Sequence, residues 1–371
     1  MPAVASLKEH KRGIVDSHVK PDSFKGLVQV VTTLLPLAAL WCFIALTADV
    51  SWLLTAAATL LMSLFVLRVF VLMHECGHGS LFREGHLNRT FGFVFGVVSG
   101  MPQHVWSQHH QRHHSTNGNW SNYRGPLNII GVDEYAAMSV PQQRRYRRAR
   151  NIWLAPLAGF LYLLLNPRLT WLRGSIGLAR HVINGKLARP DVSIREHAHG
   201  FKTTCWSSRQ EYRHMLWNNL VLLSLWGVMA WLIGPILFFT CYTISMSLAG
   251  AAGILLFSVQ HNFEHSYASH DEGWDHVRAA IDGTSFLVLP RWLNWFTANI
   301  AYHHIHHLSA RIPNYCLIAC HKEHQHLFAN VRRIRLGEVP AALKYILWDK
   351  HARRIVSVAE HEQQRRLSTV S

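Results

Sequence analysis

Residues 50–78 read VSWLLTAAATLLMSLFVLRVFVLMHECGH. The first part, 50–73, carries a single charge at Arg68 and is long enough to cross a bilayer as one helix. This apolar run leads directly into His74 and His78, which are four positions apart and therefore share a helix face. The stretch predicts a membrane-spanning helix that presents two imidazoles at one end.

Three more apolar runs have the length of membrane spans. Asn218 and Asn219 are the only strongly polar residues in one of them, and short connections at Ala48-Asp49 and Gly234-Pro235 join the runs in pairs. We therefore predict an all-α integral membrane protein, with four transmembrane helices in two hairpins and a helical cytoplasmic domain. The predicted spans are 27–47, 50–73, 215–233 and 235–259.

Shorter apolar stretches are expected to lie at the membrane surface or to re-enter it. Residues 91–102 and 152–165 are too short to cross, and 283–300 is interrupted by Pro290. The basic stretch 141–150 is expected to attract anionic lipid headgroups, although it also suits an acidic redox partner. Arg68 is near enough to the end of its span that we expect its side chain to snorkel to the interface.

The distribution of charge indicates an orientation. The chain of 371 residues has 37 Lys and Arg against 21 Asp and Glu, yet both hairpin tips lack basic residues. The positive-inside rule then places both termini and the central loop in the cytoplasm, at the inner or plasma membrane if the source is bacterial. A hydrophobic content of 49% excludes a disordered chain, and the long uncharged runs argue against a soluble nucleic-acid binder.

The chain has 27 histidines, and many of them are clustered. The pattern His-x-x-His-His occurs at His110 and again at His303, and a further pair, His261 and His265, follows the last span. In this pattern the first histidine shares a helix face with the other two, while the adjacent pair diverges by about 100°. That divergence suits two metal ions, and all the clusters lie at the cytoplasmic ends of their segments. The nine candidate metal ligands are His74, His78, His110, His113, His114, His261, His303, His306 and His307, with His265 as an alternative to His261.

The other histidines have plainer interpretations. His109 and His304 lie off the shared helix faces and are expected to be structural, whereas His86 and His104 are left undecided. The spacing of His321, His324 and His326 near Cys316 and Cys320 matches no standard zinc finger. We expect solvated surface positions for His10, His18, His181, His197, His199, His351 and His361.

A protease interpretation competes at the first cluster. His74-Glu75-Cys76-Gly77-His78 fits the zinc protease motif His-Glu-x-x-His, with Asp282 as a candidate third ligand. This interpretation leaves seven histidines unexplained and lacks a proline-containing context at Asp282. A metal transporter is also disfavoured, because none of the four predicted spans contains a histidine apart from His74 at the end of the second.

The combined clusters resemble the three histidine boxes of the membrane fatty acid desaturases. His74-Glu-Cys-Gly-His78 is similar to the first box of the acyl-lipid type, and the runs starting at His110 and His303 match the second and third. The continuation His-Leu-Ser-Ala-Arg-Ile-Pro-Asn-Tyr315 is similar to bacterial members, and the stretch around His261 resembles the segment that supplies an extra ligand. The resemblance covers roughly residues 30–325.

The resemblance implies an enzyme with two iron ions that activates O₂ and dehydrogenates a fatty acyl chain, which we expect to be lipid-linked. Glu75, Glu264 and Asp282 are expected to orient ligand histidines. The third box begins with His303 where cytochrome-b5-fused relatives have Gln, and no His-Pro-Gly-Gly haem motif occurs, so we expect a separate electron donor, ferredoxin-like or cytochrome b5-like. A hydroxylase or carotenoid ketolase on the same scaffold remains an alternative. We expect the domain to cover 27–327, between a cytoplasmic segment 1–26 and a basic tail 328–371.

Overall fold

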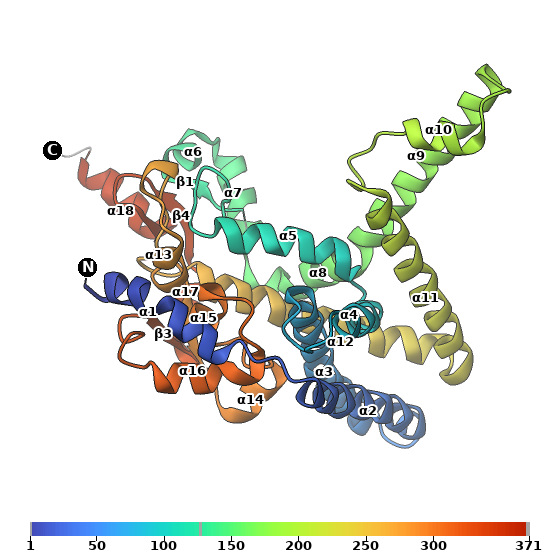
Figure 1. Cartoon of the computed structure of the whole chain (residues 1–371), viewed down its shortest axis with the longest axis horizontal. Coiled ribbons are helices and arrows are strands. Elements are labelled where there is room, and N and C mark those ends of the chain that lie inside the picture. Colours follow the sequence, from blue (N-terminus) through green and yellow to red (C-terminus); the bar gives the residue numbers. More distant parts are fainter. Residues whose placement is uncertain (1, 126–127, 369–371) are drawn as a thin grey trace.

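The computed structural model describes residues 2–125 and 128–368 and is mostly helical (Figure 1). Helix α3 begins after Ser51, whose hydroxyl caps it, and ends at Gly79, which adopts the left-handed conformation that favours glycine. Four long helices match the four predicted spans: α2 (Ser23–Thr47), α3 (Trp52–His78), α11 (Arg209–Ile233) and α12 (Pro235–His261).

A fifth long helical segment differs from the prediction. The apolar stretch 152–165 continues without a break into a polar helix, so that 152–188 has the length and hydropathy of a membrane span. Within the described residues five helices meet that criterion, one more than the sequence analysis predicted. The segment comprises a 3₁₀ turn η1 (Ile152–Leu154), α8 (Ala155–Phe160), a π-helical turn η2 (Leu161–Leu165) and α9 (Asn166–Ala188).

The π-helical turn explains how this helix continues past Pro167. Proline clashes with the carbonyl four residues earlier in an α-helix, and a π turn changes that geometry. Arg168 then bonds the released carbonyls, with its Nη1 3.4 Å from Leu163 O and 3.3 Å from Leu164 O. The same guanidinium donates to Asn218 Oδ1 at 3.0 Å and to Asn219 Oδ1 at 2.6 Å. The two asparagines of α11 therefore serve to fix the 152–188 segment.

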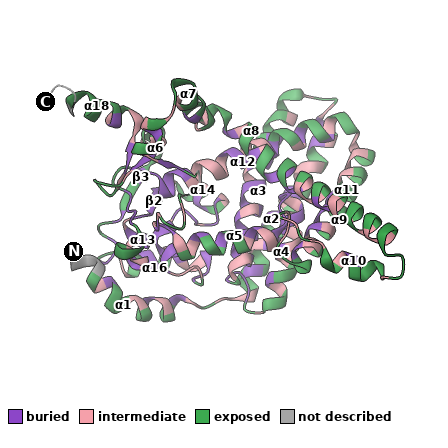
Figure 2. Ribbon diagram, turned by 90° about the horizontal axis from the view of Figure 1, so that it is seen from above, coloured by how far each residue is buried: buried purple, intermediate pink, exposed green. Residues whose placement is uncertain are grey.

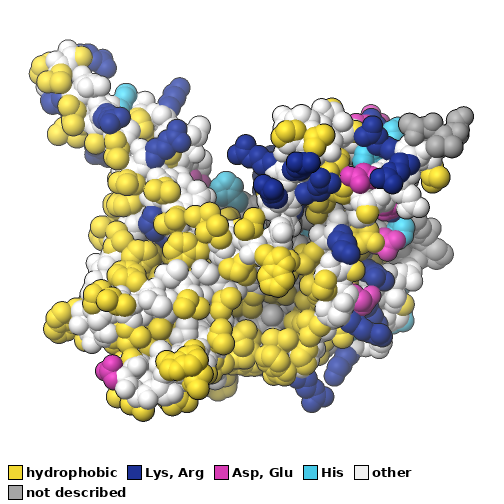
Figure 3. All heavy atoms as spheres, turned by 180° about the vertical axis from the view of Figure 1, so that it is seen from behind, with side chains coloured by type: hydrophobic (Ala, Val, Ile, Leu, Met, Phe, Trp, Pro, Cys, Tyr) yellow, Lys and Arg dark blue, Asp and Glu magenta, His cyan; other side chains and the backbone are white. Residues whose placement is uncertain are grey.

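Beyond this anchor, α9 and the short helix α10 (Ile194–Gly200) form an arm that projects away from the rest of the molecule (Figure 1). The arm is largely exposed, while buried residues concentrate around α3, α12 and the segment 277–308 (Figure 2). Figure 3 shows hydrophobic side chains over the lower part of one face, with Lys and Arg gathered toward its upper and right edges.

The remaining helices are shorter and surround the ends of α3 and α12. They are α1 (Pro2–His18), α4 (Gly85–Val98), α5 (Gln103–Thr116), α6 (Val132–Ala137), α7 (Val140–Ala149), α13 (His276–Ile281), α14 (Arg291–Phe296), α15 (His303–Leu308), α16 (Leu317–Glu323), α17 (Val339–Ala342) and α18 (Val358–Ser368), with 3₁₀ turns η3 (Asp271–Gly273), η4 (Asn314–Cys316) and η5 (Leu336–Glu338).

The expectation of an all-α chain needs a correction, because the described part also contains short strands. Two parallel strands pair residues 285–288 with 332–335, and a second small sheet has the order β1-β4-β5. The segment after residue 328 is therefore folded against the rest of the chain. The strands are β1 (Ile130–Gly131), β2 (Ser285–Val288), β3 (Arg332–Arg335), β4 (Tyr345–Asp349) and β5 (Arg354–Ser357).

Arg68 does not snorkel as predicted. Its side chain is 2% exposed and donates from Nε to Thr33 Oγ1 at 2.9 Å and from Nη2 to Gln29 Oε1 at 3.2 Å. It also bonds the Trp295 carbonyl and stacks over the Trp295 ring. Polar partners on α2 and α14 thus satisfy the guanidinium inside the protein, as a buried charge requires.

Three histidines expected at the surface are buried. His18 at the end of α1 packs against α16, His197 lies against α9, and His361 lies near the ring of Tyr135. The prediction was wrong because it used local polarity, and long-range packing of short amphipathic helices is not visible in local polarity.

Candidate metal centre

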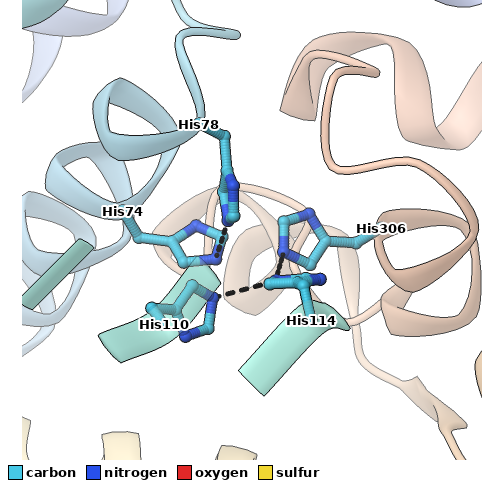
Figure 4. A group of neighbouring side chains, drawn as sticks. All are labelled: His74, His78, His110, His114 and His306. Carbon is cyan, nitrogen blue, oxygen red and sulfur yellow. Dashed lines mark hydrogen bonds between the residues drawn. The ribbon is translucent and has the colours of Figure 1, made fainter. Parts of the chain in front are cut away.

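Five histidines from three helices converge on one point (Figure 4). We call them group one: His74 and His78 from α3, His110 and His114 from α5, and His306 from α15. The Nε2 atoms are 3.2 Å apart in the first pair and 2.9 Å apart in the second, and His306 Nε2 is 3.0 Å from His114 Nε2. One nitrogen from each ring lies within 4.8 Å of all the others, a spacing that one ion can bridge.

Four further histidines form a second cluster, which we call group two. His113 comes from α5, His261 is the last residue of α12, and His303 and His307 come from α15. His261 Nε2 and His303 Nε2 are 2.9 Å apart. The two groups adjoin, since the rings of His114 and His307 stack with centroids 4.2 Å apart. The nine histidines singled out from the sequence therefore lie in two neighbouring groups.

Helix periodicity explains how each repeated motif is divided. On α5, His110 and His114 are one turn apart and join group one, whereas His113 points into group two. On α15, His303 and His307 are one turn apart and join group two, whereas His306 points into group one. Adjacent histidines thus face different groups, as the 100° rotation per residue predicts.

Glu75 contacts His74 on the side of its ring that faces away from group one. Its Oε1 is 3.1 Å from His74 Nδ1, while its Oε2 accepts from Ser80 Oγ at 3.0 Å and from the Asn314 backbone N–H at 3.1 Å. A carboxylate here keeps the proton of His74 on Nδ1 and leaves the Nε2 lone pair directed at group one. The expectation for Glu75 agrees with this geometry, but Glu264 is exposed and Asp282 bonds Arg278 instead.

A glycine allows the helices that carry the first two motifs to approach closely. Gly77 lies between His74 and His78 on α3 and faces Ser107 on α5. A Cβ atom at position 77 would overlap Ser107 Oγ and lie 3.1 Å from Ser107 Cβ. The absence of a side chain at Gly77 therefore sets the distance between these two helices.

The protonation of the histidines suits metal binding. Burial holds the pKa of six of them well below the usual value, so their rings are neutral and keep a lone pair. Among the described residues, both ring nitrogens of His113 and Nε2 of His307 are buried without a hydrogen-bond partner. Buried polar atoms are normally paired, so this donor set fits a metal ion. The six histidines are His110, His113, His114, His303, His306 and His307.

The structure separates the other candidates from the two groups. His265 is exposed, has a positive φ and lies 3.5 Å from Glu264, so it does not replace His261 in group two. His304 is buried outside both groups, with its Nε2 3.1 Å from His321 Nδ1. His86 and His109 are exposed, and His104 contacts His214.

An apolar cavity of about 600 Å³ adjoins the histidines. His110 and His113 line one part of it, and Arg112 and Asn122 supply polar groups. A smaller cavity of about 20 Å³ touches His74 and His303. The two cavities share the lining residues Phe70, Gly253 and Phe257.

These cavity residues were not predictable from the sequence, because they look like ordinary members of apolar helices. Gly253 is one example. It lines the cavity, and the space where its Cβ atom would lie is open, with nothing within 4 Å. Arg168 was also missed, although the paired Asn218 and Asn219 in an apolar run signalled a polar partner.

Comparison with known proteins connects this centre to a family. The family model described as fatty acid desaturase matches residues 50–336, which include all nine histidines. A fatty acid desaturase of Bacillus subtilis (strain 168) is 33% identical over 344 residues, or 92% of this chain and 88% of that protein. The chain belongs to the fatty acid desaturase family.

This desaturase also has more distant relatives whose names specify lipid substrates. The sn-1 oleoyl-lipid 12-desaturase of Picosynechococcus is 25% identical, over 76% of this chain and 73% of that protein. The acyl-lipid omega-3 desaturase (cytochrome b5) of Arabidopsis thaliana is 24% identical, over 71% of this chain and 62% of that protein. The protein is therefore a membrane-bound oxidoreductase of lipid metabolism.

Proposed function

We propose that this desaturase uses two iron ions and O₂ to introduce a double bond into a lipid-linked fatty acyl chain, with electrons from a separate donor protein. The observation that carries the proposal is the pair of adjacent all-histidine groups beside an apolar cavity. Residues 27–327 would form the catalytic domain, and the C-terminal segment packs onto it through the β2–β3 pair.

Each iron would be held by one histidine group. Imidazole also suits zinc, copper and nickel, so the choice of iron rests on the family. When bound, the iron pair supplies the O₂ activation needed to break unactivated C–H bonds. The five imidazoles of group one and the four of group two are neutral ligands, and Glu75 fixes the ring orientation of His74.

The cavity would hold the acyl chain against the histidines. Phe70, Phe257 and Trp106 line it with apolar surface, which excludes water from the reacting carbons. Trp106 stacks on the His110 ring with centroids 4.4 Å apart and donates from Nε1 to Tyr162 Oη at 3.1 Å. These contacts would fix the wall of the cavity and one ligand ring together.

Separate observations support the acyl carrier, the electron donor and the orientation of the protein in the membrane. Two relatives are named for lipid-linked substrates, and one of those names mentions cytochrome b5, which supports a lipid carrier and a protein donor. If α2, α3, α11 and α12 cross the membrane and 152–188 does not, the basic residues outside the hairpin tips support a centre and termini on the cytoplasmic side.

Expression in a host that makes only saturated and monounsaturated acyl chains tests the reaction. We expect new double bonds in the extracted lipids, detected by gas chromatography and mass spectrometry. New hydroxyl or keto groups would instead support a hydroxylase or ketolase. His306→Ala should abolish the product and lower the iron content, whereas the exposed control His86→Ala should retain both. Full activity of His306→Ala would contradict the proposed ligand set.

A further inference from the structure

A third group of metal-binding side chains lies outside the two histidine groups. His18 is the last residue of α1, Glu323 is the last residue of α16, and His324 follows it. His18 Nε2 is 3.2 Å from Glu323 Oε2, and His324 Nε2 is 3.8 Å from Glu323 Oε1. One ligand atom from each residue lies within 4.8 Å of the other two. The group shares no residue with the centre described above.

The proton on His18 can be assigned from its other ring nitrogen. His18 Nδ1 is 3.0 Å from the Ile14 carbonyl oxygen, which only accepts hydrogen bonds. Ser17 Oγ is also 2.9 Å from Nδ1, but its hydroxyl donates to the same Ile14 carbonyl at 3.0 Å, so Nδ1 faces two acceptors and carries the proton. In this tautomer the lone pair of Nε2 points at the Glu323 carboxylate. Two acceptors that face each other repel unless a cation lies between them. The bond from Nδ1–H to a backbone carbonyl is also the arrangement that typically orients a metal-binding histidine.

A second nitrogen points to the same position. His324 Nε2 is buried and has no hydrogen-bond partner among the described residues. A doubly protonated His18 would satisfy Glu323 as an ion pair, but it would leave the His324 nitrogen unpaired. A cation bound by all three side chains satisfies every one of these atoms.

We propose that His18, Glu323 and His324 bind one Zn²⁺ ion. Two imidazole nitrogens and one carboxylate oxygen form a recurrent three-residue zinc donor set, with water in the fourth position. Glu323 has a side chain that is 61% exposed, so solvent reaches this side of the site.

The site would fasten the N-terminal helix over the third histidine motif. Leu7 and Ile14 of α1 share a buried cluster with Ile305 and Leu308 of α15, the helix that carries His303, His306 and His307. Nearer the start of α1, Lys8 forms an ion pair with Asp275. Zinc bound at His18 would hold the last turn of α1 on α16 and thereby keep α1 packed against the outer side of α15.

Metal analysis of the full-length protein tests the proposal. Purified protein is first loaded with iron in detergent, then equilibrated with Zn²⁺ and freed of excess metal, and iron and zinc per chain are measured by mass spectrometry. We expect about one zinc per chain in addition to iron. His18→Gln and His324→Gln should lose this zinc and keep the iron. The matched controls His10→Gln and His326→Gln change exposed histidines on the same segments and should keep both metals.

Two measurements keep the test decisive. Glu323→Gln alters a side chain that is 61% exposed, and it should weaken zinc binding at least tenfold without loss of iron. Added Zn²⁺ should raise the melting temperature of the wild type and of both controls but not of His18→Gln. Equal zinc in the wild type and in His18→Gln and His324→Gln would overturn the proposal, because the zinc would then occupy the other histidine groups. A wild type that binds no zinc would overturn it as well.

Discussion

Gly77 provides a direct test of how the centre is built, because it allows α3 and α5 to come into contact. We consider Gly77→Ala, which places a Cβ atom against Ser107 Oγ and 3.1 Å from Ser107 Cβ. Forcing an extra carbon into such a contact typically costs about 1–3 kcal/mol. Alanine also improves helix propensity by about 1 kcal/mol, which partly offsets the clash.

A matched control separates these two effects. Gly227 lies on α11, and a Cβ atom added there would meet nothing within 4 Å, so Gly227→Ala changes helix propensity without a clash. We therefore expect Gly77→Ala to be less stable than Gly227→Ala by about 1–3 kcal/mol. Unfolding by SDS in mixed micelles measures this difference. Iron per chain should also fall in Gly77→Ala, because α5 carries His110 and His114 and must shift to relieve the overlap.

A second substitution should rescue the first. Ser107→Ala removes the overlapping oxygen, so the double variant should regain most of the lost stability and iron. The single variant Ser107→Ala should be mild, since it removes only the bond from Gln103 Nε2 at 3.0 Å. Equal stability of Gly77→Ala and Gly227→Ala, or a failure of Ser107→Ala to rescue, would refute the close contact between α3 and α5.

Three further predictions concern the site. Glu75→Gln should weaken iron binding roughly 10–100-fold in a metal titration, because the carboxylate orients His74, and unchanged affinity would contradict that role. His261→Ala should lose part of the iron while His265→Ala keeps all of it, as metal analysis would show; the reverse pattern would make His265 the ligand. Gly253→Leu should fill the cavity and lower kcat/KM for long acyl chains by roughly 10–200-fold relative to short ones, measured by chromatography of the products. An equal loss for long and short chains would argue against a place for Gly253 along the bound acyl chain.

The way each histidine motif is divided between the two groups was predictable from the sequence, because it depends on spacing within one short helix. The spacing of His303, His306 and His307 fixes which side of a helix each one faces, and the structure divides them between the groups accordingly. The long apolar runs were predictable for the same reason, since the length of α3 and the position of His74 at its end are both properties of one segment.

Other features were not predictable, because they depend on contacts between distant segments. Arg68 is buried only because Gln29 and Thr33 on α2 and the Trp295 carbonyl meet it. The 152–188 helix extends past Pro167 because a π turn and Arg168 accommodate the break. The pairing of β2 with β3 joins segments that show no alternating pattern of their own.

The division of each motif between the two groups also constrains the order in which the centre can assemble during synthesis. A nascent chain that ends before α15 already holds four of the five histidines of group one, from α3 and α5. The same chain holds two of the four histidines of group two, His113 and His261. Four imidazoles could therefore hold a metal at the first position before α15 is synthesised, whereas the second position has only two until His303 and His307 are added.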